Sequence, residues 1–324
     1  MSNQFLLKTL DACEYPAEFL VARLLGKRGS LFRNWEFLLS SSDAVQSLQD
    51  SPFYPYLRRY AAAGVWHFLR DEHLWIYRKM NPSLRKSFTP YFIFHEIKIL
   101  LVCLRLLHAG SEREPVLQEL HNSLLHGAIE DILTSADDFV TMLHGLETYL
   151  SRHSDIFQGF CARYEKEGLA ALEIFIRNSF FTYIFSLKQP VQLLVFMQDM
   201  VDFHNCLALA KAIRWHSEPE PDFIPGGKTA LDIFRKAYFS KEMTPLLRVV
   251  GLQDYPEADS TPQELETTVL TLITLKLKRK SYQRTVTGDI LFYLWLQYCY
   301  TRNISMILHT IQVDDELVRK SMVA

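Results

Sequence analysis

The predicted fold follows from one stretch, Phe196-Met-Gln-Asp-Met-Val-Asp202-Phe-His-Asn205-Cys-Leu-Ala-Leu-Ala-Lys-Ala-Ile-Arg214. Its apolar side chains recur every three or four residues, which is the period of one face of an α-helix. A short polar group, Asp202 to Asn205, interrupts the pattern, which then resumes. Burying the amide of Asn205 is costly unless it is hydrogen-bonded. We therefore expect it to bond a neighbouring helix or loop, and a direct contact with a partner is the alternative.

Two other stretches repeat this pattern. In residues 91–105 the polar group is centred on Glu96, and in residues 293–308 it is Arg302-Asn303. The three polar groups lie roughly a hundred residues apart, a spacing that suggests an internal repeat. The sequence therefore predicts three related helical lobes. The polar residues that mark the repeat are Glu96, Asp202, Asn205, Arg302 and Asn303.

Breaks in the helical pattern separate the predicted lobes. Residues 217–227 contain three prolines and two glycines, so they cannot form a regular helix, and they end in the turn Pro225-Gly226-Gly227. An earlier break falls near residues 109–115, and a further joint at 251–260 precedes a capping box at Thr261-Pro-Gln-Glu264. We expect an all-α protein with lobe 1 at 1–110, lobe 2 at 111–217 and lobe 3 at 218–324.

The composition is that of a soluble or peripheral protein with a substantial core. Of 324 residues, 48% are hydrophobic and 22% are charged, and the net charge of −2 gives no general attraction to nucleic acid. The N-terminus lacks the features of a signal peptide, and no run of 18 uncharged apolar residues predicts a membrane span. The five cysteines are scattered and have no metal-binding spacing, which predicts buried free thiols in a reducing compartment.

Two motifs that could carry chemistry are incomplete. Gly226-Gly227-Lys228-Thr229 resembles the end of a phosphate-binding loop, but the position that needs the first glycine is Asp222. His95-Glu96 begins like a zinc protease helix, but Ile99 replaces the second histidine. We therefore predict no catalytic, cofactor-binding or metal-binding residue.

The strongest basic run contains Lys276, Lys278, Arg279 and Lys280. A solvated helix face is one interpretation of such a run. The other is a contact with anionic lipid headgroups or with an acidic partner. The sequence leaves both open.

Four features together resemble a known family. They are Glu14-Tyr15-Pro-Ala-Glu-Phe19-Leu-Val-Ala22-Arg23 near the N-terminus, Asp202-Phe-His-Asn205, the turn Phe223-Ile-Pro-Gly-Gly227, and the C-terminal series Leu265-Glu266, Tyr293, Arg302-Asn303-Ile and Asp314-Asp-Glu316-Leu-Val-Arg319. Their order and spacing are similar to those of the C subunit of A-type and bacterial V-type rotary ATPases, called subunit d in the eukaryotic enzyme. Glu96 stands where the family has asparagine, and Tyr300-Thr301 stands where an acidic residue usually precedes Arg-Asn. The chain thus resembles a divergent member.

The resemblance implies a fold and a function. Family members are all-helical and funnel-shaped, with three similar lobes around a pseudo-threefold axis. They catalyse no reaction and bind no cofactor. They link the central stalk of the rotary motor to the membrane ring of ion-carrying subunits, on the cytoplasmic face, during proton or sodium transport and ATP synthesis or hydrolysis. The alternatives are an all-α repeat adaptor or scaffold and, less favoured, an all-α enzyme.

Overall fold

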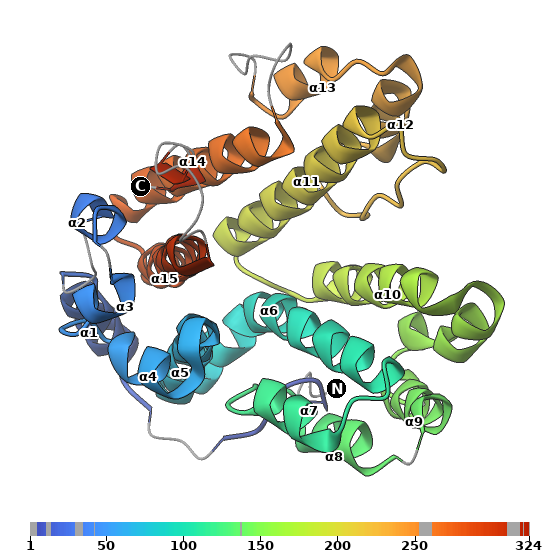
Figure 1. Cartoon of the computed structure of the whole chain (residues 1–324), viewed down its shortest axis with the longest axis horizontal. Coiled ribbons are helices and arrows are strands. Elements are labelled where there is room, and N and C mark those ends of the chain that lie inside the picture. Colours follow the sequence, from blue (N-terminus) through green and yellow to red (C-terminus); the bar gives the residue numbers. More distant parts are fainter. Residues whose placement is uncertain are drawn as a thin grey trace. The chain divides into compact units, whose positions relative to one another are not determined.

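The computed structural model describes residues 5–10, 14–29, 35–41, 43–136, 138–252, 261–309, 318–319 and 321–323, without the side chain of Glu36. The described residues are mostly helical and contain no strand (Figure 1). Its β-pairing is limited to an isolated bridge between Leu7 and Leu125. The predicted all-α class is confirmed, whereas the three-lobed funnel stays a prediction.

The helices vary in length from single turns to long rods. The longer α-helices are α1 (Ala17–Gly29), α5 (Gly64–Lys79), α6 (Pro82–His108), α9 (Phe139–Ser151), α10 (Phe160–Ser186), α11 (Val191–Arg214), α12 (Leu231–Ser240), α14 (Pro262–Ser281) and α15 (Val286–His309). The shorter ones are α2 (Trp35–Leu39), α3 (Ala44–Ser47), α4 (Tyr54–Tyr60), α7 (Arg113–Leu120), α8 (Gly127–Ser135) and α13 (Thr244–Val249), with 3-10 turns η2 (Ala61–Ala63) and η3 (Asp155–Phe157).

The described residues cluster into two compact units that interleave along the sequence. Unit 1 contains Met1–Glu14, Tyr77–Met197 and Ile224–Gly226, and unit 2 contains Tyr15–Ile76, Gln198–Phe223 and Gly227–Ala324. The lobe boundaries at 110 and 217 stay a prediction.

In unit 1, α6 and α10 lie side by side and form the centre of the packing (Figure 1). The Asn81 side chain accepts the Leu84 N–H at 2.9 Å and caps α6, while Pro82 occupies the first turn, where no N–H bond is lost. The face of α6 toward α10 is aromatic, and Phe94 meets Phe181 edge to face with 5.8 Å between ring centroids. Capping thus starts the helix, and aromatic burial fixes it to its neighbour.

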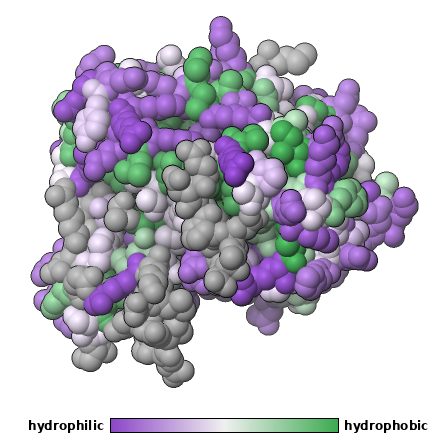
Figure 2. Space-filling model, turned by 90° about the horizontal axis from the view of Figure 1, so that it is seen from above, coloured by the Kyte–Doolittle hydropathy of each residue, from purple (hydrophilic) through white to green (hydrophobic). Residues whose placement is uncertain are grey.

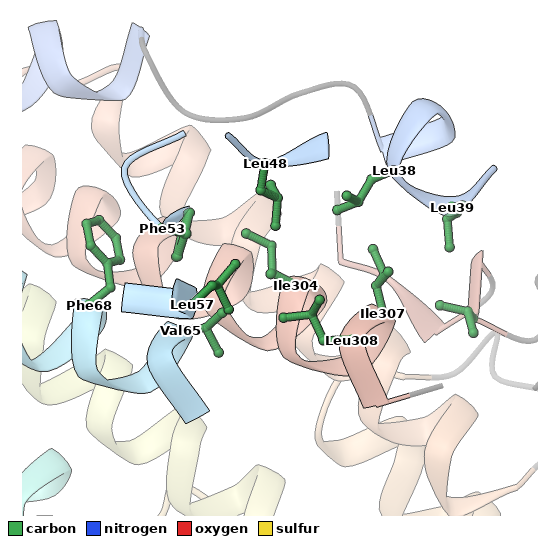
Figure 3. Close-up of a cluster of buried hydrophobic side chains, with 11 residues drawn as sticks. Leu38, Leu39, Leu48, Phe53, Leu57, Val65, Phe68, Ile304, Ile307 and Leu308 are labelled. Atoms are coloured by element: carbon green, nitrogen blue, oxygen red, sulfur yellow. The ribbon is translucent and has the colours of Figure 1, made fainter. Parts of the chain in front are cut away.

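In unit 2, α15 packs against both α1 and α14. Its last turns also cover the short helices α2 to α4, with which they share a buried apolar cluster (Figure 3). The side chains labelled there are Leu38, Leu39, Leu48, Phe53, Leu57, Val65, Phe68, Ile304, Ile307 and Leu308. The capping box predicted at Thr261-Glu264 has both of its hydrogen bonds and starts α14.

A buried carboxylate joins α1, α5 and α15 in unit 2. Glu72 accepts two hydrogen bonds from Lys27 Nζ, at 2.7 and 2.8 Å, and a third from the Tyr293 hydroxyl at 2.8 Å. Gln297 in turn donates to that hydroxyl at 2.7 Å. Burial and the charge of Glu72 both raise the pKa of Tyr293, so its phenol stays protonated and keeps donating. A buried charge is tolerated here because it is fully paired.

The polar groups of the repeat do not break their helices. Glu96, Asn205 and Asn303 each lie inside a continuous helix, respectively α6, α11 and α15. The polar groups therefore interrupt the apolar pattern of these helices but not their helical backbone. A real kink occurs in α10, where Gly168 adopts φ +78°.

Several sequence predictions can be compared with the described residues. Among these residues, one helix, α11, is long and apolar enough to cross a membrane, but 56% of its most apolar window is buried, as in many core helices of soluble proteins. The four described cysteines, at 103, 161, 206 and 299, are buried free thiols as predicted. Cys13, residues 253–260 of the predicted joint, and Asp314 to Glu316 lie outside the described residues.

Replacing Tyr293 by phenylalanine tests the carboxylate network. The change leaves the ring in place but removes the donor to Glu72 and the acceptor for Gln297. We expect it to lower the free energy of unfolding by about 1–3 kcal/mol, measured by urea denaturation. The matched control is Tyr282→Phe, because Tyr282 is 68% exposed. Equal stability of the two variants would show that the network contributes nothing.

Candidate functional site

The centre of the candidate site is the buried carboxylate of Asp202 on α11. It accepts the backbone N–H groups of Lys228 and Thr229 at 3.2 Å and the Thr229 hydroxyl at 3.1 Å. Burial raises the pKa of Asp202, and the hydrogen bonds from Thr229 and Lys228 act in the opposite direction. The carboxylate therefore holds the chain where it leaves the proline-rich linker.

Glycine is needed in this turn for two different reasons. At Gly227, a Cβ atom would lie 2.0 Å from the Asp202 Oδ1 atom, so any side chain would push the turn off the carboxylate. At Gly226, φ is +96°, a conformation that residues with side chains rarely adopt. Gly227 of the predicted turn therefore lies against Asp202 of the predicted polar group.

A second carboxylate, Asp199, lies one helical turn before Asp202. Its Oδ1 atom pairs with Lys228 Nζ and lies 3.5 Å from Lys276 Nζ on α14. Asp199 keeps little exposure, whereas about two-fifths of each lysine side chain is exposed. The ion pairs thus lie at the surface of unit 2, one helical turn along α11 from the buried Asp202.

The predicted basic run divides into two pairs on α14. Lys276 and Lys280, four residues apart, lie on one face and are half-buried near Asp199. Lys278 and Arg279 point elsewhere and are exposed. Half of the run therefore belongs to the Asp202 site, and the other half is open to solvent.

The side chains of Asp199, Asp202, Lys228 and Lys276 border a cavity of about 210 Å³ within unit 2. Polar and apolar groups line it in similar shares. The lining residues are Asp199, Asp202, Phe203, Cys206, Lys228, Thr229, Val249, Val250, Gly251, Leu252, Val269, Leu272, Ile273 and Lys276. Among the described residues, no group of three or more histidine, cysteine or acidic side chains could hold a metal ion.

The other residues of the repeat make separate contacts. Asn303 is fully buried, and its amide both donates to Val323 O at 2.8 Å and accepts the Val323 N–H at 3.2 Å. Its neighbour Arg302 donates to Ser321 O at 2.9 Å and lies 3.3 Å from Glu266. Together they hold the described end of the chain, 321–323, against α15.

Glu96 and Asn205 are also buried. In unit 1, Glu96 accepts the Ser123 hydroxyl at 2.6 Å, and that hydroxyl accepts the Leu125 N–H. Asn205 is 1% exposed and lies on α11 one turn after Asp202. Both residues are thus internal. Of the predicted site residues, the structure brings Asp202 and Gly227 into contact, and Lys276 lines the same cavity as Asp202.

Sequence reasoning missed Asp199, Lys228 and Thr229 as members of this site. The signal for Asp199 was its spacing, because residues three apart on a helix share a face. Lys228 follows the glycine turn directly, but its ion pair with Asp199 spans 29 positions of sequence. That pairing depends on where the linker returns to α11.

The variant Gly227→Ala tests the Asp202 turn. Its Cβ would collide with the carboxylate, so we expect the free energy of unfolding to fall by about 1–3 kcal/mol in urea denaturation. Gly26→Ala is the control, because a Cβ there meets no atom within 4 Å and alanine favours the helix. A Gly227→Ala protein as stable as wild type would contradict the close approach.

The variant Asn303→Leu tests the bond to the C-terminal segment. Leucine has a similar volume but leaves the buried Val323 N–H and C=O without their side-chain partner. We expect a loss of about 2–3 kcal/mol and a lower thermal midpoint. An unchanged midpoint would show that the amide is dispensable.

Comparison with known proteins supplies the family. The model of the family described as ATP synthase (C/AC39) subunit matches residues 67–320, from α5 to the C-terminal segment. No curated protein matches the chain. The match covers more than half of the chain and contains the whole candidate site. The resemblance noted in the sequence is thereby confirmed. The chain belongs to the C/AC39 subunit family of V- and A-type rotary ATPases.

Proposed function

We propose that this chain is the non-catalytic coupling subunit of a rotary ATPase, linking the central stalk to the membrane ring of ion-carrying subunits. The observation that carries the proposal is the family match over residues 67–320. In this role the chain is peripheral to the membrane on its cytoplasmic face. It transmits rotation and leaves ATP chemistry and ion binding to its partners.

The packing of the described helices supports a mechanical role. A subunit that passes torque must not deform under load, and close-packed helices with aromatic cores have low compressibility. Both units carry such packing, with α6 against α10 in unit 1 and α15 against α1 and α14 in unit 2. Buried hydrogen bonds at Glu72, Asp202 and Asn303 fix neighbouring segments further.

The surface supports a role in distributed polar contacts. Figure 2 shows one face of the molecule, on which hydrophilic residues dominate and hydrophobic ones are exposed in small groups between them. A partner ring that presents many equivalent subunits can be held by several such contacts at once. The exposed pair Lys278 and Arg279 supplies positive charge for anionic headgroups or an acidic partner.

Co-purification from native membranes tests the proposed function. A tagged chain should retain both central-stalk and ring subunits after mild detergent extraction, and mass spectrometry identifies them. Recovery of the chain with neither set would refute the proposal. Recovery with stalk subunits alone would refute the proposed link to the ring.

Charge reversal tests the exposed basic pair. We expect Lys278→Glu with Arg279→Glu to weaken association with the membrane complex by at least about tenfold in a pull-down, because each basic residue near an anionic surface contributes about 1 kcal/mol. The matched control, Lys278→Arg with Arg279→Lys, keeps the charge and should associate as wild type does. Undiminished association of the reversed variant would exclude a role for this pair.

A further inference from the structure

The mouth of the unit 2 cavity carries more positive than negative charge. Lys228 and Lys276 both approach the same oxygen of Asp199. Lys280 lies one turn beyond Lys276 and interacts electrostatically with the same carboxylate. Asp202 adds little negative charge at the mouth, because it is buried and its oxygens accept the N–H groups of the linker turn. Two ammonium groups thus pair with one carboxylate, and a third lies one helical turn further along α14.

The crowding of these lysines has a physical consequence. Burial lowers the pKa of Lys280. Repulsion from the charges of Lys228 and Lys276 lowers this pKa further, whereas the attraction of Asp199 raises it. An additional anion among the ammonium groups would relieve this repulsion. A cation would worsen it, so the charge at the mouth favours an anionic ligand.

Apolar side chains form one part of the cavity wall. Phe203, Leu252 and Ile273 are buried along its wall, and Val249 stands at the rim with 57% of its surface exposed. A cavity of about 150 Å³ holds a benzene molecule, so the volume of about 210 Å³ has room for an apolar group of about eight carbon atoms beside the polar part of the wall. A few polar groups converging on an apolar hollow are typical of ligand sites.

We propose that this cavity binds an amphiphilic anion, a carboxylate or phosphate ester whose apolar group enters the hollow while Lys228 and Lys276 in its lining, with Lys280 one helical turn beyond, hold its charged head. Lysine suits this task because its ammonium group binds carboxylate and phosphate as a point charge. The ligand is a free small molecule or the end of an anionic lipid, which share this chemistry. The site does not depend on the proposed coupling function.

Calorimetric titration of the full chain with octanoate and with octyl phosphate tests the proposal. We expect both to bind with one-to-one stoichiometry and neutral octan-1-ol to bind at least about tenfold more weakly, since a charge-assisted hydrogen bond to lysine is lost. Failure of octanoate and octyl phosphate to bind would overturn the proposal. Binding of octan-1-ol as tight as that of octanoate would also overturn it.

Two charge-neutralised variants locate the head of the ligand. Lys276→Gln with Lys280→Gln should weaken octanoate binding at least about tenfold. Lys278→Gln with Arg279→Gln removes the same charge from the same helix outside the cavity, and it should change binding less than about twofold. Equal weakening by both pairs would show diffuse attraction to a basic helix and would overturn the assignment.

A third variant locates the apolar group. Val249→Trp fills the exposed rim without adding a ring to the core, so we expect it to abolish octanoate binding while the thermal midpoint stays within a few degrees of wild type. Unchanged octanoate binding by a folded Val249→Trp protein would place the ligand elsewhere and overturn the proposal.

Vesicles distinguish the two sources of the ligand. Sedimentation with phosphatidylglycerol vesicles, compared with pure phosphatidylcholine vesicles, measures attraction to anionic lipid. If octanoate binds and competes with this sedimentation, the natural ligand is a lipid, and if octanoate binds without competing, it is a free molecule. Both results support the proposed binding of an amphiphilic anion in the cavity. Vesicle binding without octanoate binding would overturn it.

Discussion

The hydrogen bonds from the backbone of residues 228 and 229 to the Asp202 carboxylate are the interaction on which the candidate site depends. They place the end of the proline-rich linker beside α11, so that Lys228 reaches Asp199 and α14 brings Lys276 to the same oxygen. Gly227 permits the approach because it has no Cβ.

The same principle recurs elsewhere in the chain. A polar side chain buried within a helix bonds the backbone or side chain of a segment that packs on that helix, as Asn303 does with Val323 and Glu96 with Ser123. Each bond offsets the cost of burying a polar group, and it also selects one position of the partner segment. The proposed coupling role would benefit from such selection, because a segment with a unique position does not slide under load.

Much of the fold was predictable from the sequence for local reasons. The capping box at Thr261 and the cap at Asn81 mark helix starts by short-range hydrogen bonding that the sequence displays directly. The glycine turn was recognisable too, but its reason was not, because Gly227 is required by a carboxylate on another element. The division of the basic run was predictable only in part. Helical spacing separates Lys276 and Lys280 from Lys278, but it does not say which face of the helix meets Asp199.

The ion pairs of the site were beyond sequence reasoning. Lys228 and Asp199 meet only because the linker returns to the helix it left. The Glu72 network likewise joins helices far apart in the chain, with 221 positions between the carboxylate and Tyr293. Long-range polar contacts of this kind follow from packing, which local pattern and periodicity do not determine. The three-lobed division rests on a weak repeat of polar groups and stays a prediction.

The most direct test of the coupling role compares ATP hydrolysis with ATP-driven ion pumping in native membrane vesicles stripped of this chain. We expect that the stripped vesicles continue to hydrolyse ATP but no longer pump ions, and that adding back the purified chain restores pumping. Pumping that continues at the original rate without the chain would contradict the account.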